Sequence, residues 1–333
     1  MNSAPVPALN RSLAPRSAVA RDGQPLSYNR APAKDLAPWI ARLYVSSVAA
    51  PETHVLSCGV FCENPVLRIR LAGDWLAQSA IGPLASTRGA FLFGPNTRRM
   101  PIEVRGSFIT AGIAFCPGAV RLLTGMAEGD IVDRLADPAL LGLSTQSWLA
   151  LFDPDAGPEH WCLQMEAALR NLIDRRGAQA PDPVSVWFER ASYADPSISV
   201  GQCASTNGID IRRLERVVRR DFGLTPKQVL RRARALDMAS HLRGVADVQE
   251  AEALMLRYYD QSHLIRDFTA LIGLSPGQFA QRPQPLMTLS LETRQQRRLE
   301  MLKRLVPGQA PPWFDKVLGL PASQPAGISQ TAS

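Results

Sequence analysis

The sequence predicts an α+β protein, in which a β-rich N-terminal domain with additional helices precedes an all-α C-terminal domain with two helix-turn-helix units. Between residues 55 and 116, runs rich in β-branched and aromatic residues alternate with Pro, Gly, Asn and Asp, as in a sandwich or barrel. From residue 184 to about residue 306, apolar residues recur at helical spacing instead. Within this helical part a unit of twenty residues occurs twice, which indicates a duplicated structural element.

The composition is that of an ordinary globular protein. Apolar residues make up 46% and charged residues 20% of the 333 positions. A net charge of +7 and a pI of about 9.5 favour an anionic partner without identifying it. The sequence has no run of eighteen apolar residues, and its first thirty residues lack the apolar segment of a secretion signal. We therefore expect a cytoplasmic protein without a membrane partner.

Proline, glycine and polar residues divide the chain into segments. Residues 177–183 read GAQAPDP, a plausible linker, and both ends of the chain are rich in Pro, Ala and Ser. We predict a disordered arm (1–34), a β-rich domain (35–176), a linker (177–183), a tandem helix-turn-helix domain (184–306) and a flexible tail (307–333).

Four runs in the N-terminal domain have the composition of strands. They read VLSCGVF, VLRIRLA, GAFLFGP and SFITAGIAF. The stretch 118–176 is predicted to be helical, with a break at Pro138. Its last helix carries Trp161, Met165, Leu169 and Leu172 at helical spacing.

The first helix-turn-helix unit has a start or stop signal at each helix boundary. Ser199 is placed to cap a short first helix, and Asp210 to cap the second. Gly223 is expected to end the second helix in the left-handed conformation. Thr225 and Pro226 then begin a long helix, which runs to about Leu242 and joins the two units.

The second unit repeats the first at an offset of fifty positions. Residues 210–229 read DIRRLERVVRRDFGLTPKQV, residues 260–279 read DQSHLIRDFTALIGLSPGQF, and seven of the pairs are identical. Asp247 and Glu250 offer a capping box for its first helix, Asp260 a cap for its second, and Gly273 a stop. Two such units suit two successive contacts with DNA, whose major groove returns to the same side about every 34 Å.

The stretch YYDQSHLIRDFTALIGLSPGQF resembles the signature of the AraC/XylS family of transcriptional regulators, and the first unit is similar to that family's leading helix-turn-helix. The stretch GIAFCPGAVRLLTG resembles an element of the β-rich domains attached to some members. The resemblance implies a cupin-like sensor or dimerisation domain and a sequence-specific regulator of transcription. It also implies double-stranded DNA, RNA polymerase, a small-molecule effector and a second copy of the chain as partners.

The resemblance further implies which residues contact bases. In this sequence the family's positions fall on Arg212, Glu215, Arg216, Gln261, Ser262 and Arg266. Arg can donate to guanine and Gln can pair with adenine. Glu215 can accept from cytosine N4 or pair instead with Arg219.

Other basic residues of the two units are expected to contact phosphates. Arg213 and His263 are placed to do so without reading sequence. Arg219 and Arg220 complete a run of five arginines within nine residues, which is more than solubility requires. We therefore include both in the predicted DNA-binding face.

Two features depart from the family pattern. Arg257 stands where the family has Gly, and a left-handed residue other than Gly costs roughly 1–2 kcal/mol. Arg257 either contacts phosphate or is strained and exposed. Residues 200–245 carry ten Lys/Arg and four Asp/Glu, whereas residues 246–280 carry two Arg and five Asp/Glu. The first unit should then supply most of the counterion release on binding DNA. The alternative to a regulator with two DNA-binding units is an interaction protein whose second unit contacts protein.

The remaining patterns do not favour an enzyme. A metal-holding cupin needs a close His-x-His pair, whereas His54 and His160 lie far apart, so we expect no enzyme, cofactor or metal. The five cysteines are interpreted as free core thiols. Core packing is favoured over a ligand pocket for Trp39, Trp75, Phe91 and Phe93. Packing on the domain is likewise favoured over phosphate contact for residues 294–304.

Overall fold

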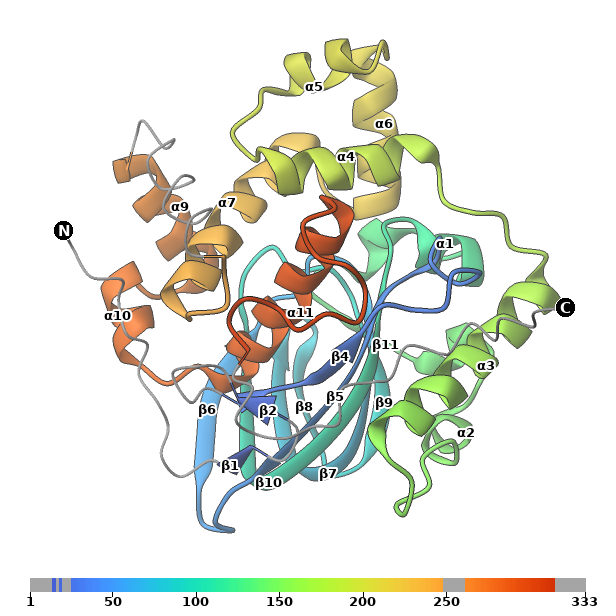
Figure 1. The fold of residues 1–333 in the computed structure, drawn as a ribbon, viewed down its shortest axis with the longest axis vertical. Coiled ribbons are helices and arrows are strands. Elements are labelled where there is room, and N and C mark those ends of the chain that lie inside the picture. Colours follow the sequence, from blue (N-terminus) through green and yellow to red (C-terminus); the bar gives the residue numbers. More distant parts are fainter. Residues whose placement is uncertain (1–13, 16–17, 20–24, 248–260, 315–333) are drawn as a thin grey trace, which may run out of the picture.

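The computed structural model describes residues 14–15, 18–19, 25–247 and 261–314. The N-terminal part is built on an antiparallel sheet and the C-terminal part is helical (Figure 1). No helix in these ranges is long and apolar enough to cross a membrane. The predicted α+β class, with a β-rich part followed by a helical part, is confirmed.

Four long strands form the middle of the sheet, in the order β5-β10-β7-β9. They span Ile40–Ala49 (β5), Met100–Phe115 (β10), Val66–Ser79 (β7) and Gly89–Phe93 (β9). Shorter strands of the same sheet are β1 (Ala14–Pro15), β4 (Tyr28–Arg30), β6 (Val55–Val60), β8 (Gly82–Ser86) and β11 (Leu135–Ala136). A separate pair consists of β2 (Ala18–Val19) and β3 (Pro25–Leu26).

The two faces of the sheet differ because successive side chains point to opposite sides of a strand. Val45 and Ile69 lie on the face that packs against the helices of the N-terminal part. These helices are α1 (Ala119–Thr124), α2 (Thr145–Leu149) and α3 (Pro158–Arg176). Tyr44 and Arg68 lie on the opposite face, which turns toward α11 (Pro285–Met301).

The C-terminal helices lie above the sheet and to its left in Figure 1, and α11 crosses in front of the strands. Besides α11 they are α4 (Pro183–Ala194), α5 (Val200–Thr206), α6 (Ile211–Phe222), α7 (Pro226–Leu242), α9 (Gln261–Ile272) and α10 (Pro276–Gln281). Leu286 and Leu289 of α11 are buried with strand residues, whereas Leu291 and Leu299 are buried with residues of α7 and α9. This helix therefore joins the core of the sheet to the core of the second unit. The packing interpretation of residues 294–304 holds for α11.

Several predicted boundaries are wrong. Residues 25–34 are not part of a disordered arm, because β4 pairs with β5 and Ser27 is only 4% exposed. The strand β5 was not predicted, because it is buried on both faces and shows no alternation of apolar and polar residues. The C-terminal helix ends at Met301 instead of about residue 306. The tail does not begin at residue 307, since Trp313 is 4% exposed within the core of the second unit.

The core prediction is confirmed for the cysteines and for two of the four aromatic residues, whereas Trp39 and Phe91 are only partly buried. All five cysteines are free and buried, and burial raises the pKa of Cys116 to about 11 and that of Cys162 to about 12. Trp75 and Phe93 are buried in the core between the sheet and α11.

Candidate nucleic-acid interface

The first unit has the predicted helix boundaries. Ser199 caps α5 by accepting a hydrogen bond from the Gln202 amide at 3.1 Å, and Gln202 completes a capping box. Asp210 caps α6, because one oxygen of its carboxylate accepts from the amides of Arg212 and Arg213 at 2.8 and 3.2 Å. Gly223 ends α6 with φ of 67°, in the left-handed region that favours glycine.

The described part of the second unit follows the same plan. Gly273 has φ of 78° just after the end of α9. Ser275 caps α10 by accepting from the Gln278 amide at 3.2 Å. The predicted capping box at Asp247 and Glu250 and the predicted cap at Asp260 fall wholly or partly outside the described residues, as does Arg257.

An exposed stripe of arginines runs along α6. Arg212, Arg216 and Arg219 are exposed at spacings of four and three, so they lie on one side of the helix. Leu214 and Val218 are fully buried on the opposite side. This stripe thus presents three guanidinium groups to solvent on the side of α6 opposite its buried core residues.

The equivalent stripe of α9 is less basic. At the same offsets it carries Ser262, Arg266 and Thr269, all exposed, above buried Leu264 and Phe268. Nε of Arg266 donates to the carbonyl of Ser262 at 3.3 Å, so its side chain lies back along the helix.

The connector helix α7 contributes to the cores of both units. Its first turns pack with α4 and α6, and its later turns pack with α9. Arg231 of α7 also donates to Asp267 of α9 at 2.7 Å, and Arg234 lies 3.7 Å from the same carboxylate. The second helix of each unit, α6 in the first and α9 in the second, is called its recognition helix below, and both are therefore fixed to one connector.

The N-terminal part holds both recognition helices at equivalent positions. The Gly118 amide donates to the carbonyl of Asp221 at 2.8 Å, and the Arg99 amide donates to the carbonyl of Leu271 at 2.8 Å. Asp221 and Leu271 are fifty residues apart, and each lies in the last turn of its recognition helix. Nε of Arg99 also donates to the Ile272 carbonyl at 2.8 Å. The opposite ends of both helices, which carry the predicted base contacts, remain exposed.

The contact of the first unit with the N-terminal part is charged. The fully buried carboxylate of Asp221 accepts from Arg121 at 3.0 Å, from Arg220 at 2.7 Å and from Ser185 at 2.7 Å. Burial alone would raise the pKa of Asp221, but these donors keep it below its ordinary value. Arg220 also lies 3.1 Å from Asp182, so the proposed DNA contact by Arg220 requires these ion pairs to open.

Glu128 lies buried beside this network. Its backbone carbonyl is close to Gly223, and burial raises the pKa of its carboxyl to about 8. The negative charge of Asp221 acts in the same direction as burial, whereas Arg121 opposes both. Glu128 is therefore largely protonated at neutral pH, at the point where α6 meets the N-terminal part.

Arginines of α11 form ion pairs with three neighbouring segments. Arg294 lies 2.8 Å from Glu63 of the N-terminal part and 2.5 Å from Asp237 of α7. Arg297 lies 2.6 Å from Glu189 of α4. The side chains of these three ion pairs are nearly buried. The helix α11 therefore fixes the N-terminal part, the connector and α4 to one another.

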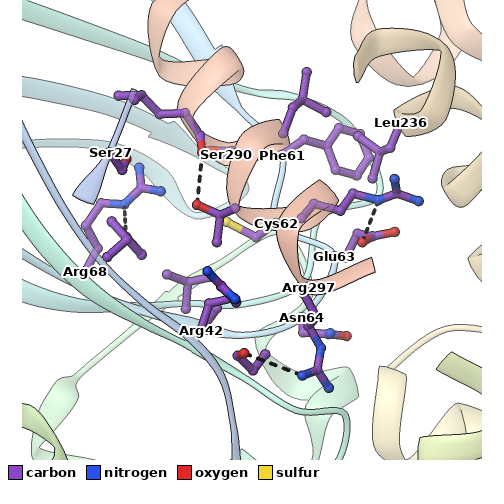
Figure 2. A pocket seen from close by; sticks show the side chains of 18 of the residues that line it. Ser27, Arg42, Phe61, Cys62, Glu63, Asn64, Arg68, Leu236, Ser290 and Arg297 are labelled. Atoms are coloured by element: carbon purple, nitrogen blue, oxygen red, sulfur yellow. Dashed lines mark hydrogen bonds and ion pairs between the residues drawn. The ribbon is translucent and has the colours of Figure 1, made fainter. Parts of the chain in front are cut away.

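A cavity of about 90 Å³ lies between the sheet and α11 (Figure 2). Its walls include Phe61 and Arg68 from the sheet side, Leu236 from α7 and Ser290 from α11. Nε of Arg68 donates to the Tyr44 hydroxyl at 3.1 Å, and its guanidinium lies 5.1 Å from the centre of the Phe93 ring. Among the described residues, no carboxylate forms an ion pair with Arg68.

The structure thus brings the predicted contact residues together in two sets. The helix α6 carries Arg212, Arg213, Glu215, Arg216, Arg219 and Arg220, and α9 carries Ser262, His263 and Arg266. Gln261 begins α9, although its side chain is outside the described residues. Sequence reasoning did not find Arg99, Arg121 or Arg68, because their roles depend on contacts across long sequence separations.

Comparison with known proteins gives two matching families. Residues 203–282 match a helix-turn-helix domain, and residues 28–137 match a domain of unknown function, DUF6597. No curated protein matches the chain.

Two solved structures of ToxT from Vibrio cholerae are similar, each with a TM-score of 0.42 over 72% of this chain. The O395 protein is 7% identical, with 96% of it covered, and the unsaturated fatty acid-bound protein of strain SCE256 is 11% identical, with 94% covered. The AraC-like transcriptional activator CuxR is 12% identical, with a TM-score of 0.26 over 60% of this chain and 78% of that chain. At these values the likenesses indicate nothing about a ligand or a DNA contact.

Proposed function

We propose that this chain, which carries an AraC-type helix-turn-helix domain at residues 203–282, is a sequence-specific DNA-binding regulator of transcription. The supporting observation is the pair of exposed recognition helices, α6 and α9, on one connector. Each presents a polar stripe to solvent and anchors its apolar side in its own core. An α-helix presented in this way fits the major groove, where base edges carry a distinct pattern of donors and acceptors.

A hydroxyl-radical footprint of the full chain on a site obtained by in vitro selection tests this function. We expect protection in two segments about 10 base pairs apart on one side of the duplex. Protection over a single turn would instead favour the interaction protein, in which the second unit contacts a protein partner. Failure of selection to enrich any sequence would contradict sequence-specific binding.

We further propose that a compact anionic effector occupies the cavity between the sheet and α11. Arg68 supports this, because a buried guanidinium without a carboxylate partner is costly unless an anion compensates it. The volume of about 90 Å³ corresponds to several water molecules at ~10–15 Å³ each, so the ligand would be small. Residues of both the sheet and α11 would touch it, which would couple its binding to the position of the DNA-binding helices.

Thermal unfolding of the full chain with acetate, benzoate or inorganic phosphate tests the effector site. We expect at least one of these anions to raise the Tm of the wild-type chain in a concentration-dependent way, because a ligand that binds the native state stabilises it. Arg68→Met should abolish the effect. Arg170→Met, which removes an ion pair of an exposed arginine with Asp35, should preserve it. No Tm shift with any anion, or equal shifts in all three proteins, would contradict the effector site.

A further inference from the structure

An isoleucine is exposed on the polar side of the second recognition helix. Ile265 of α9 is 44% exposed and lies between exposed Ser262 and exposed Arg266 and Thr269. Few large apolar side chains of the described residues are exposed to this extent. The apolar core of the second unit is complete without Ile265, since Leu264, Phe268 and Ile272 fill it.

The neighbouring threonine extends this apolar surface. The Thr269 hydroxyl donates to the Ile265 carbonyl at 2.8 Å, one turn back along the helix. That bond holds the hydroxyl against the backbone, a common arrangement for threonine within a helix. The outer edge of α9 therefore combines an isoleucine side chain with a threonine whose hydroxyl is already engaged.

The first unit has a different chemistry at the equivalent position. Fifty residues before Ile265 stands Glu215, which is one of the predicted base contacts of α6. A carboxylate there accepts hydrogen bonds, whereas the branched alkyl group of Ile265 can only make apolar contact. The two helices therefore carry an arginine at the same position, Arg216 and Arg266, but the residue before it is Glu215 in one and Ile265 in the other.

We propose that Ile265 is a specificity-determining residue that reads the 5-methyl group of a thymine in the half-site of the second unit. This inference rests on the proposed DNA-binding function. The thymine methyl is the apolar group that a base pair presents in the major groove, and apolar side chains contact it there. The half-site of the second unit then requires a thymine at a position where the first unit selects through Glu215.

The test uses the full chain and a selected site whose footprint assigns the second half-site. Each thymine of that half-site is replaced in turn by deoxyuridine, which removes only the methyl group. We expect one replacement to weaken wild-type binding about fourfold, the effect of losing one buried methyl-sized group. Ile265→Ala should weaken binding to the thymine site by a similar factor and should be insensitive to that replacement.

Two further variants control this experiment. Val55→Ala shortens a side chain of β6 that is 40% exposed and lies outside the recognition helices, so it should retain the full sensitivity to deoxyuridine. Thr269→Ser removes a methyl group and keeps the hydroxyl, and it tests whether Thr269 adds to the same apolar edge. If wild type binds its site but Ile265→Ala keeps the same sensitivity to every deoxyuridine, the thymine inference is wrong. If the chain binds no DNA, the proposed function fails instead.

Discussion

The first and second helix-turn-helix units have the same helix signals but different surroundings. Gly223 and Gly273 both adopt positive φ at the end of a recognition helix. A Cβ on Gly223 would lie 2.9 Å from the Glu128 carbonyl oxygen, whereas a Cβ on Gly273 would meet nothing within 4 Å. The same residue therefore serves only as a helix stop in the second unit, but also allows close docking on the N-terminal part in the first.

The attachments of the two units differ in chemistry as well. The first unit is attached through the charged network around Asp221, and the second through main-chain carbonyls that accept from Arg99. The exposed stripe of α6 also carries three arginines, whereas that of α9 carries one. The first unit thus combines the stronger attraction to phosphate with the more charge-sensitive attachment to the N-terminal part.

The largest expected effect comes from removing the carboxylate of the first attachment. Asp221→Ala should lower the free energy of unfolding by about 3 kcal/mol, because two arginines and Ser185 lose a buried acceptor. Asp267→Ala in the second unit should cost less than about 1 kcal/mol, because Arg231 is well exposed. Urea unfolding of the full chain measures both, and equal costs would show that the buried network around Asp221 contributes no more than the exposed ion pair of Asp267 with Arg231 of α7.

Each recognition helix carries an arginine at the equivalent position, Arg216 in α6 and Arg266 in α9, and replacing each one tests whether both units read DNA. Arg216→Ala and Arg266→Ala should each weaken specific binding by about 1–3 kcal/mol and relax selection at one base pair. The relaxed positions should fall in different half-sites. In vitro selection with each variant measures this, and unchanged selection with Arg266→Ala alone would restrict base reading to the first unit.

The unequal charge of the two stripes should appear in the salt dependence of binding. Arg219→Ala should reduce the slope of log K against log salt by about one, since it removes one phosphate contact. Thr269→Ala, at the equivalent position of α9, should leave the slope unchanged. Titrations across a series of salt concentrations measure both slopes. A wild-type slope for Arg219→Ala would exclude Arg219 from the interface.

The last prediction concerns the pH dependence of stability and does not involve DNA binding. Because the pKa of Glu128 is raised to about 8 in the folded chain, that chain binds a proton more tightly than the unfolded chain does. The contribution of Glu128 to stability is then present below its unfolded pKa of about 4.3 and decreases as the pH rises toward 8. Between pH 5 and pH 8, the Tm of Glu128→Gln should fall less than that of wild type, by at least about 2 °C. An equal decrease in Tm for wild type and Glu128→Gln would show that Glu128 does not make the first attachment sensitive to pH.

Local signals explain why so much of the C-terminal part was predictable. Caps such as Ser199 and Asp210 act on amides two or three residues away, so their effect is readable from sequence. The repeat at fifty residues likewise revealed both recognition helices and their exposed faces. The strand β5 and the packed residues near Trp313 were missed, because burial on all sides leaves no periodic pattern.

The sequence by itself determined the duplicated units, their caps and stops, and the polar stripes that face solvent, since each depends on neighbours within a helical turn or two. Only the tertiary structure decided that Gly118 and Arg99 hold the two units at equivalent carbonyls, that Arg121 pairs with Asp221, and that a cavity lies beneath α11. These features join residues that are 100 or more positions apart or depend on how whole elements pack. Their geometry depends on burial and charge across the complete fold, and a short stretch of sequence does not contain that information.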